Sequence, residues 1–350
     1  MNTAPAHCRS FPTMSPDPLV VHTERGLYCP PGDFYIDPKR PVQTAVITHG
    51  HGDHLRAGSV RYILARPGVA IAEARLPGRP EILALDYGAR VGLGATSVSL
   101  HPAGHILGSA QVRIAHEGRV WVVSGDYKRQ ADPTCAAFEP LACDVFVSEA
   151  TFGLPVYRWP PTGAVIEEIL AWWRANRERG VASVLYCYAL GKAQRVLAEL
   201  APHTAEPIHL HGSMTELVEV YRAAGIAMPA TLPVVTERKT DFRGALVLAP
   251  PSAAERSWIR RVGEHSSGFC SGWMTVRGEG RRRGYDLGFV ISDHADWPAL
   301  VGTCLESRAK RVLLTHGEPE VLARHLIDHG LDAQPLERAA GTARSAARPQ

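Results

Sequence analysis

The sequence predicts an α/β protein in which a β-rich unit is interrupted by an inserted α/β unit. Three observations lead to this prediction. From Leu19 to about Glu149, short β-branched or aromatic runs alternate with loops rich in Gly, Pro and Asp. After Thr151, apolar residues recur at helical spacing and helices alternate with strands, which is typical of a parallel α/β layer. Past about residue 287 the strand pattern returns, so we expect the chain to re-enter the first unit.

The expected elements follow in order along the chain. In the first unit, strands are predicted for six runs, LVVHT, TAVIT, VSLHP, QVRIA, VWVVSGD and DVFVSEA. In the insertion, TGAVIEEILAWWRANRERG predicts a helix that stops at Gly180, and GKAQRVLAEL and TELVEVYRAAG predict two more helices. VASVLYCYAL and GALVLAP predict buried strands in the same unit. The closing segments GFVISDHADW and RVLLTHGEP again predict strands that end in polar residues.

These patterns set the expected boundaries. We expect a loose N-terminal extension over residues 1–18 and a first unit split between 19–150 and 287–335. The insertion should cover 151–286, and an Ala- and Arg-rich flexible tail should cover 336–350.

Composition narrows the functional class. The net charge of +3 over 350 residues does not by itself indicate nucleic acid. There is no run of 18 apolar residues, so we expect no membrane span, and the first sixteen residues lack the apolar centre of a secretory signal. The seven cysteines are odd in number and form no C-x-x-C pair, which predicts reduced thiols in a cytoplasmic protein.

The stretch ITHGHGDH carries the most specific chemical signal. His49, His51, Asp53 and His54 are four potential metal ligands within six residues, directly after an apolar run. Burying so many polar groups is costly unless something compensates, and a metal ion compensates best. This loop therefore predicts a metal site.

Further potential ligands lie at or just after the ends of other predicted strands, and Asp37 lies in FYIDP. The full set is Asp37, His105, Asp126, Glu149, His294 and His316. A tetrahedral zinc accepts four ligands, and a catalytic zinc takes only three from the protein. The ligand-type residues are too many for one ion, and two ions that share a bridging carboxylate fit the count.

The order of these motifs resembles a known family. THGHGDH, GHILGSAQ, SGDY, SEATFG, SDHADW and LTHGE resemble the metallo-β-lactamase superfamily, and more narrowly its β-CASP nucleases. GLYCPPGDFYIDP, YCYALGKAQRVL, SGWMTVRG and GFVISDHADW are similar to the bacterial ligase-associated DNA exonucleases. The resemblance runs in order from about Leu19 to Leu331. It implies an αββα sandwich with an inserted β-CASP-like domain that binds the substrate.

The resemblance also implies a role for each candidate residue. The first metal ion would be held by His49, His51 and His105, the second by Asp53, His54 and His316, with Asp126 bridging them. Asp37 would support the ligand loop from behind. The catalytic residues implied are His294, Glu149 and Asp53, with His294 protonating the leaving group and Glu149 oriented towards it.

The implied reaction is phosphodiester hydrolysis by two divalent ions, with zinc expected and manganese as the alternative. Two such ions lower the pKa of a shared water, and the resulting hydroxide would attack phosphorus. We expect a DNA exonuclease in DNA repair, with nucleic acid, an ATP-dependent DNA ligase and a helicase as partners. His316 leaves an RNA-processing endo- or exoribonuclease open as the first alternative, because the RNA-processing members carry histidine there. An inactive scaffold that binds nucleic acid or a partner is the second alternative.

Basic runs in the insertion suggest where the substrate would lie. The candidates are Lys192, Arg195, Arg238, Lys239, Arg281, Arg282 and Arg283. Three such runs in one unit favour a groove that follows phosphates, and the first lies at a helix start, where backbone N–H groups also attract phosphate. For Trp273 the sequence favours core packing, with base stacking as the alternative.

Overall fold

The computed structural model of the protein describes residues 18–234, 240–254 and 257–336. The expected extension and tail therefore lie outside the described residues except at their inner ends. The described chain forms three β-sheets with helices packed against them, so the prediction of an α/β protein is confirmed. None of its described helices combines the length and apolar character that a membrane span requires.

The first sheet has six strands in chain order, and its last three pairings are parallel. The strands are β1 (Val21–Thr23), β2 (Gly26–Cys29), β3 (Phe34–Ile36), β4 (Thr44–Val46), β5 (Arg61–Ala65) and β6 (Glu81–Leu85). After β5 come the 3-10 helix η1 (Arg66–Gly68) and helix α1 (Val69–Arg75).

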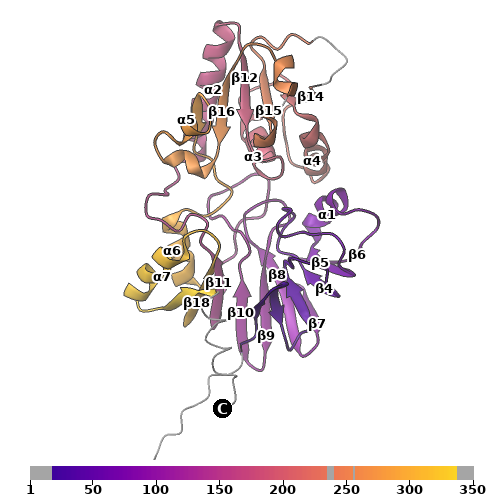
Figure 1. Ribbon diagram of the computed structural model, residues 1–350. Helices are drawn as coiled ribbons and strands as arrows, with labels where there is room; N and C mark the ends of the chain where they lie inside the picture. The colour runs from indigo at the N-terminus through magenta and orange to yellow at the C-terminus, as the bar shows by residue number, and fades with distance from the viewer. Residues whose placement is uncertain (1–17, 235–239, 255–256, 337–350) are drawn as a thin grey trace, which may run out of the picture.

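The second sheet has seven strands in the order β19-β18-β11-β10-β9-β8-β7. They are β7 (Arg90–Leu93), β8 (Thr96–Pro102), β9 (Ala110–His116), β10 (Arg119–Val123), β11 (Val145–Glu149), β18 (Arg311–Thr315) and β19 (Asp332–Pro335). The last two strands come from the C-terminal part of the chain, drawn in yellow beside β11 in Figure 1. The C-terminal strands thus join the sheet that β7 to β11 form.

The two sheets enclose one apolar core, and helices cover their other faces. Val46 and Ile63 of the first sheet pack with Val98 and Val112 of the second. Successive strand residues point to opposite faces, so Tyr62 is left to pack under α1 on the outside. On the second sheet the outer face is covered by two helices, α6 (Trp297–Glu306) and α7 (Pro319–Asp328).

The insertion is built on a third sheet in which every described pairing is parallel. Its order is β14-β13-β15-β12-β16-β17. The strands are β12 (Ala182–Tyr186), β13 (Ile208–Leu210), β14 (Thr231–Pro233), β15 (Leu246–Ala249), β16 (His265–Cys270) and β17 (Leu287–Phe289). The helices are α2 (Thr162–Glu178), α3 (Lys192–Leu200), α4 (Gly212–Ala223) and α5 (Glu279–Arg282), with 3-10 turns η2 (Pro251–Ala253), η3 (Ser257–Arg261) and η4 (Gly272–Thr275).

One boundary differs from the expectation. Residues 287–289, expected to begin the return to the first unit, form β17 and pair with β16 of the third sheet. The strand predicted over GFVISDHADW ends at Phe289, so Asp293 and His294 lie in the connection that follows it. The return to the first unit therefore starts after Phe289.

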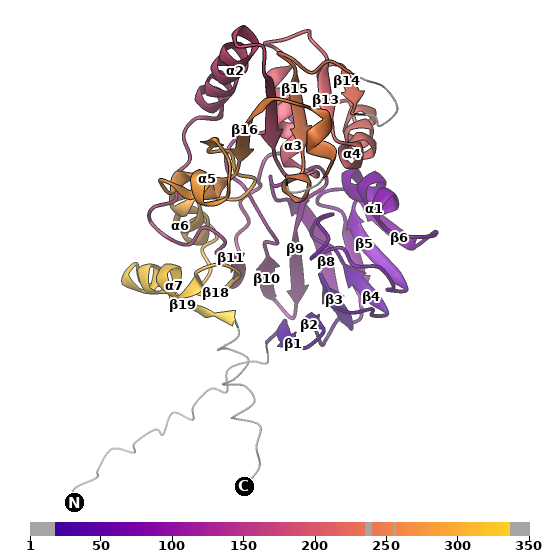
Figure 2. The same ribbon diagram turned by 45° about the horizontal axis from the view of Figure 1, so that its top comes forward.

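The two sheets of the first unit form one body, and the insertion forms a second. The two bodies meet through an apolar contact and a buried charge network. Ile71 of α1 and Ile106 pack with Leu217 and Tyr221 of α4, and α1 and α4 are adjacent in Figures 1 and 2. The Tyr221 hydroxyl accepts a hydrogen bond from the Leu107 backbone N–H at 3.2 Å.

The charge network centres on Arg195, which is 1% exposed. Its guanidinium donates to the Ser292 carbonyl at 2.6 Å and to the Thr162 hydroxyl at 2.7 Å. Its Nε lies 3.6 Å from Asp132, a residue of the first body that also binds Lys128. Arg195 thus links the insertion, the first body and the connection that carries His294.

We predict that Arg195→Met destabilises the fold by about 3–5 kcal/mol, because removing one partner leaves buried charge uncompensated. Urea unfolding followed by circular dichroism would measure the change. Arg243→Met is the matched control, because Arg243 is exposed and pairs with Asp241 at the surface. Equal unfolding midpoints for the two variants would show that the network does not hold the bodies together.

Candidate metal centre

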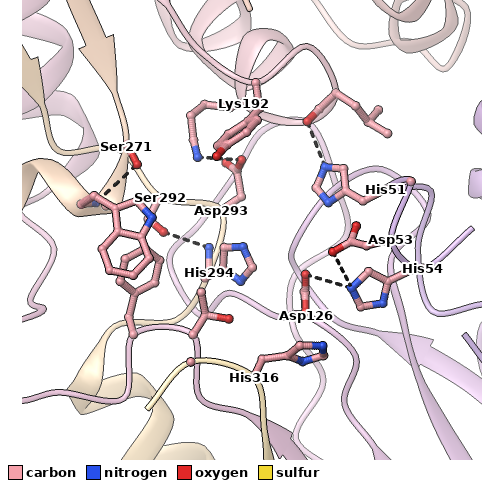
Figure 3. Close-up of a pocket in the computed structure, with 18 of the residues that line it drawn as sticks. His51, Asp53, His54, Asp126, Lys192, Ser271, Ser292, Asp293, His294 and His316 are labelled. Atoms are coloured by element: carbon pink, nitrogen blue, oxygen red, sulfur yellow. Dashed lines mark hydrogen bonds and ion pairs between the residues drawn. The ribbon is translucent and has the colours of Figure 1, made fainter. Parts of the chain in front are cut away.

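A cavity of about 590 Å³ lies where the first body meets the insertion. The first body contributes Arg75 of α1 and residues that follow the carboxyl ends of β4, β10, β11 and β18. The insertion contributes residues that follow β12 and β16, including Leu190, Lys192 and Ser271. Figure 3 shows His51, His54, Asp126 and His294 drawn together in this cavity.

Four donor atoms converge at the base of the cavity. Nδ1 of His51 lies 3.0 Å from Nε2 of His49 and 3.1 Å from Nε2 of His105. Oδ2 of Asp126 lies 3.5 Å from the His49 nitrogen and 3.8 Å from the His105 nitrogen. A tetrahedral ion with bonds of about 2.0–2.1 Å holds its ligand atoms about 3.3 Å apart. The donor set therefore fits one metal ion.

Hydrogen bonds behind two of these rings fix which nitrogen faces the metal. The other nitrogen of His105, Nδ1, donates to the Asp293 carbonyl at 2.7 Å. The other nitrogen of His51, Nε2, donates to the Leu190 carbonyl at 3.1 Å. A nitrogen that donates to a carbonyl carries the proton, so the opposite nitrogen presents a lone pair to the site.

Asp37 and Thr48 fix in the same way which nitrogen of the third ring, His49, faces the metal. Asp37 accepts hydrogen bonds from the Thr48 N–H at 2.8 Å, the Thr48 hydroxyl at 2.5 Å and His54 Nδ1 at 2.7 Å. Because the hydroxyl donates to Asp37, its oxygen accepts from His49 Nδ1 at 3.1 Å. Gly125 lets the loop before Asp126 approach Thr48: its φ is +57°, and a Cβ there would lie 2.6 Å from Thr48 Cβ.

The electrostatics of the cluster suit metal binding. Burial lowers the pKa of His49 and of His105 well below the usual range, and neighbouring imidazoles reinforce the effect. Burial works against ionisation of Asp126, but His54 and then His294 outweigh it and hold the pKa of that carboxyl well below its usual value. Neutral imidazoles facing an ionised carboxylate are the protonation states that a metal requires.

A second, more open group of donors shares Asp126. Nε2 of His54 lies 3.5 Å from Asp126 Oδ2 and 3.7 Å from Asp53 Oδ2, and the Asp53 side chain is 73% exposed. Burial lowers the pKa of His54, but Asp126 and Asp37 outweigh it and raise that pKa to about 10. Protonated His54 is a cation that these carboxylates stabilise. The same carboxylates would stabilise a metal cation bound to the neutral ring. His316 lines the cavity with its ring centre 5.8 Å from that of His54.

Glu149 and His294 form a pair on the far side of Asp126. His294 Nδ1 donates to Glu149 Oε2 at 2.8 Å, and Glu149 also accepts from the Tyr127 N–H and the Thr151 hydroxyl. Burial lowers the pKa of His294, but Glu149 and then Asp126 outweigh it and raise that pKa to about 9. Asp126, Glu149 and His294 offer ligand atoms within 4.8 Å of one another, so geometry alone also permits a metal between them.

The nucleic-acid contacts expected from the sequence are only partly available. Arg195 is buried in the network described above and cannot reach a substrate, so its prediction was wrong. Lys192 is largely buried, with Nζ 3.1 Å from Asp293, but it lines the cavity. The exposed arginines at 281–283 lie on α5 and at its end. Arg238 and Lys239 lie outside the described residues.

Sequence reasoning missed three groups behind the ligands. The Thr48 hydroxyl, the Leu190 carbonyl and Asp293 orient the histidines, but two of these contacts use backbone carbonyls, which carry no residue signature. Asp293 precedes His294 in SDHADW, so an acid beside the candidate histidine was visible in the sequence, but its burial was not.

Comparison with known proteins gives several relatives, although no protein-family model matches the chain. The chain is 34% identical over 330 residues to a protein of Opitutus terrae named probable DNA ligase, covering 90% of this chain and 31% of that protein. It is 28% identical over 212 residues to ribonuclease TTHA0252 of Thermus thermophilus, covering 52% of this chain and 48% of that protein. It is 28% identical over 150 residues to endoribonuclease YSH1 of Gibberella zeae, covering 41% of this chain and 18% of that protein.

The chain thus spans about a third of the first relative and about half of the second. Among solved structures, a protein of unknown function from Enterococcus faecalis superposes with a TM-score of 0.56 at 13% identity. That match covers 80% of this chain and 76% of the other and bears on the fold alone.

We predict that Thr48→Val weakens metal binding about 10- to 100-fold, because it removes the hydroxyl that orients His49 without changing the size of the side chain. Competition titration with a chromophoric chelator, with zinc as the probe ion, would measure it. Thr151→Val is the matched control: it removes a hydroxyl that binds Glu149, outside the four-donor cluster. Unchanged affinity in Thr48→Val would mean that His49 is oriented by other contacts.

Proposed function

Because the chain belongs to the metallo-β-lactamase superfamily, in its β-CASP branch, we propose that it hydrolyses phosphodiester bonds in nucleic acid with two divalent metal ions. The observation that carries the proposal is the Glu149–His294 pair beside the metal cluster. A lactone or thioester hydrolase has no need of a separate proton donor of this kind, whereas a phosphodiester with a sugar leaving group does.

The fold and domain division are part of this proposal. We assign residues 19–150 and 290–335 to the αββα sandwich of the superfamily. Residues 151–289 would be the inserted β-CASP-like domain, which closes one side of the cavity. The packing of two sheets face to face, with α1 on one outer face and α6 and α7 on the other, supports the assignment.

The ligand assignment follows the geometry of the two donor groups. His49, His51 and His105 would hold one ion and Asp53, His54 and His316 the other, with Asp126 shared. Zinc is the ion proposed, since imidazole and carboxylate ligands in a four-donor site suit it. When bound, the ions would supply positive charge for the phosphoryl oxygens and a water of lowered pKa.

The chain itself supplies the proton for the leaving group. Hydrolysis forms a P–O bond to a water oxygen and breaks the P–O bond to a sugar oxygen, which departs as a poor leaving group unless it is protonated. His294 directs Nδ1 to Glu149, so Nε2 is the nitrogen left to donate. Glu149 stabilises the protonated imidazole by its charge and its hydrogen bond, and it raises the pKa of His294.

DNA is the substrate we propose, with exonucleolytic cleavage in DNA repair beside an ATP-dependent ligase and a helicase. The support is that 90% of this chain aligns with part of a protein named probable DNA ligase. The rival substrate is RNA, favoured by the relatives named ribonuclease and endoribonuclease and by His316 in the cavity. Metal-loaded protein incubated with end-labelled single- and double-stranded DNA and RNA separates the two, and product ladders distinguish exo- from endonucleolytic cutting.

We predict that His294→Ala slows cleavage of DNA about 10²- to 10⁴-fold while metal content stays unchanged. A nitrophenyl phosphodiester has a leaving group that needs no proton, so its hydrolysis should fall much less. Glu149→Gln should show the same selectivity in weaker form, because it removes the charge that holds the imidazole protonated. Loss of a metal ion in His294→Ala, or equal slowing of both substrates, would make His294 a ligand or a structural residue instead.

A further inference from the structure

An aromatic wall borders His294 on one side. The wall is formed by Phe152, Tyr157, Trp159 and Trp273. The ring centre of Phe152 lies 4.8 Å from that of Tyr157, 4.8 Å from that of Trp159 and 4.9 Å from that of Trp273. It also lies 5.9 Å from the ring centre of His294. In Figure 3, Ser271, which immediately precedes the turn that carries Trp273, is drawn on the opposite side of His294 from His54 and Asp126.

Of the wall residues that line the cavity, Trp273 is the one that is partly exposed to it. Trp273 and Phe152 both line the cavity, but Phe152 is buried, whereas Trp273 is half-buried. The indole N–H of Trp159 donates to the His294 carbonyl at 2.9 Å. The indole N–H of Trp273 makes no hydrogen bond within the described chain, so this ring has no polar contact that would explain its position.

The local fold holds Trp273 in place before any ligand binds. The Ser271 hydroxyl accepts from the Trp273 backbone N–H at 3.4 Å, and the Thr275 hydroxyl donates to the Gly272 carbonyl at 2.9 Å. A Cβ on Gly272 would lie 2.7 Å from both Phe152 and Trp159, so only glycine lets this turn approach the wall. A platform fixed in this way loses little conformational entropy when a ligand stacks on it.

Basic residues continue beyond this turn. Helix α5 begins at Glu279, whose backbone N–H donates to the Val276 carbonyl at the end of the turn. Arg281 and Arg282 are exposed on this helix. Their charges suit the phosphate next to a stacked nucleotide, since phosphate contacts are electrostatic and indifferent to sequence.

We propose that Trp273 stacks on the nucleobase attached to the leaving side of the bond that is cut, and that the strand on that side continues over α5. The proposal rests on the proposed function, because His294 defines the leaving side only if it protonates the departing oxygen. Stacking on an indole accepts every base, which suits a nuclease that reads no sequence. A nucleobase-stacking subsite deepens the nuclease proposal by fixing the direction of the strand across the cavity.

The test uses single-stranded oligonucleotides that lack one base on either side of a single cut. Wild-type protein is used first, and the phosphorylated end of its products identifies the leaving oxygen and therefore the leaving side. Trp273→Ala should lower kcat/KM about 5- to 150-fold on the intact oligonucleotide, as expected for one lost base–aromatic contact. On the oligonucleotide that lacks the leaving-side base, Trp273→Ala should lower kcat/KM less than about twofold. On the oligonucleotide that lacks the base on the opposite side of the cut, the full loss in kcat/KM should remain. Trp273→Phe should keep most of the activity.

Tyr188→Ala is the matched control. Tyr188 is also an aromatic residue that lines the cavity, from the end of neighbouring strand β12, and it is 52% exposed. Its substitution should show no dependence on the leaving-side base. Hydrolysis of a nitrophenyl methyl phosphodiester, which carries no base, should be unchanged in Trp273→Ala if the metal centre and His294 are intact.

Equal losses by Trp273→Ala on all oligonucleotides, or no loss on any, would overturn the proposal and leave Trp273 a packing residue. Binding of the same oligonucleotides in EDTA, measured by fluorescence anisotropy, separates this failure from failure of the proposed function. Absence of cutting by the wild type would refute the nuclease. Equal affinity of wild type and Trp273→Ala would refute the stacking subsite, whether or not the wild type cuts.

Discussion

Three imidazole nitrogens and one carboxylate oxygen face the same point at the base of the cavity, and the rest of the structure serves this arrangement. Without a cation, neutral nitrogen lone pairs about 3 Å apart repel one another, and their removal from water is uncompensated. The hydrogen bonds from these histidines to the Thr48 hydroxyl and to the Leu190 and Asp293 carbonyls hold the rings in this orientation. The cluster is thus arranged for a metal, and this requirement explains the polar residues behind it.

The position of the insertion is tied to the same cluster. His51 is oriented by the Leu190 carbonyl, which follows β12 of the insertion, and His105 by the Asp293 carbonyl, which follows β17. Asp293 in turn binds Lys192, and Arg195 binds the neighbouring Ser292 carbonyl. A movement of the insertion would therefore disturb the ligands directly. The unit that closes the cavity also sets the geometry of the metal centre.

Much of this organisation could be predicted because it is local in the sequence. The loop at 49–54 carries four potential ligands, and most of the remaining candidates lie near the end of a run with strand character, so they could be recognised in the sequence. The short strand β17 was misplaced because three residues carry no periodicity that assigns them to one sheet. Arg195 was misread because a basic residue at a helix start attracts phosphate only if it is exposed, and burial depends on packing between distant segments. Contacts made by the Leu190 and Asp293 carbonyls are invisible in a residue pattern for the same reason.

The central claim is that two metal ions share Asp126 between the two donor groups. Anomalous diffraction from crystals of the metal-loaded protein, collected on both sides of the zinc absorption edge, tests it most directly. The account predicts two peaks about 3.5–4 Å apart, with a carboxylate oxygen of Asp126 bound to each and His294 bound to neither. A single peak among His49, His51 and His105, or a second peak between Glu149 and His294, would contradict it.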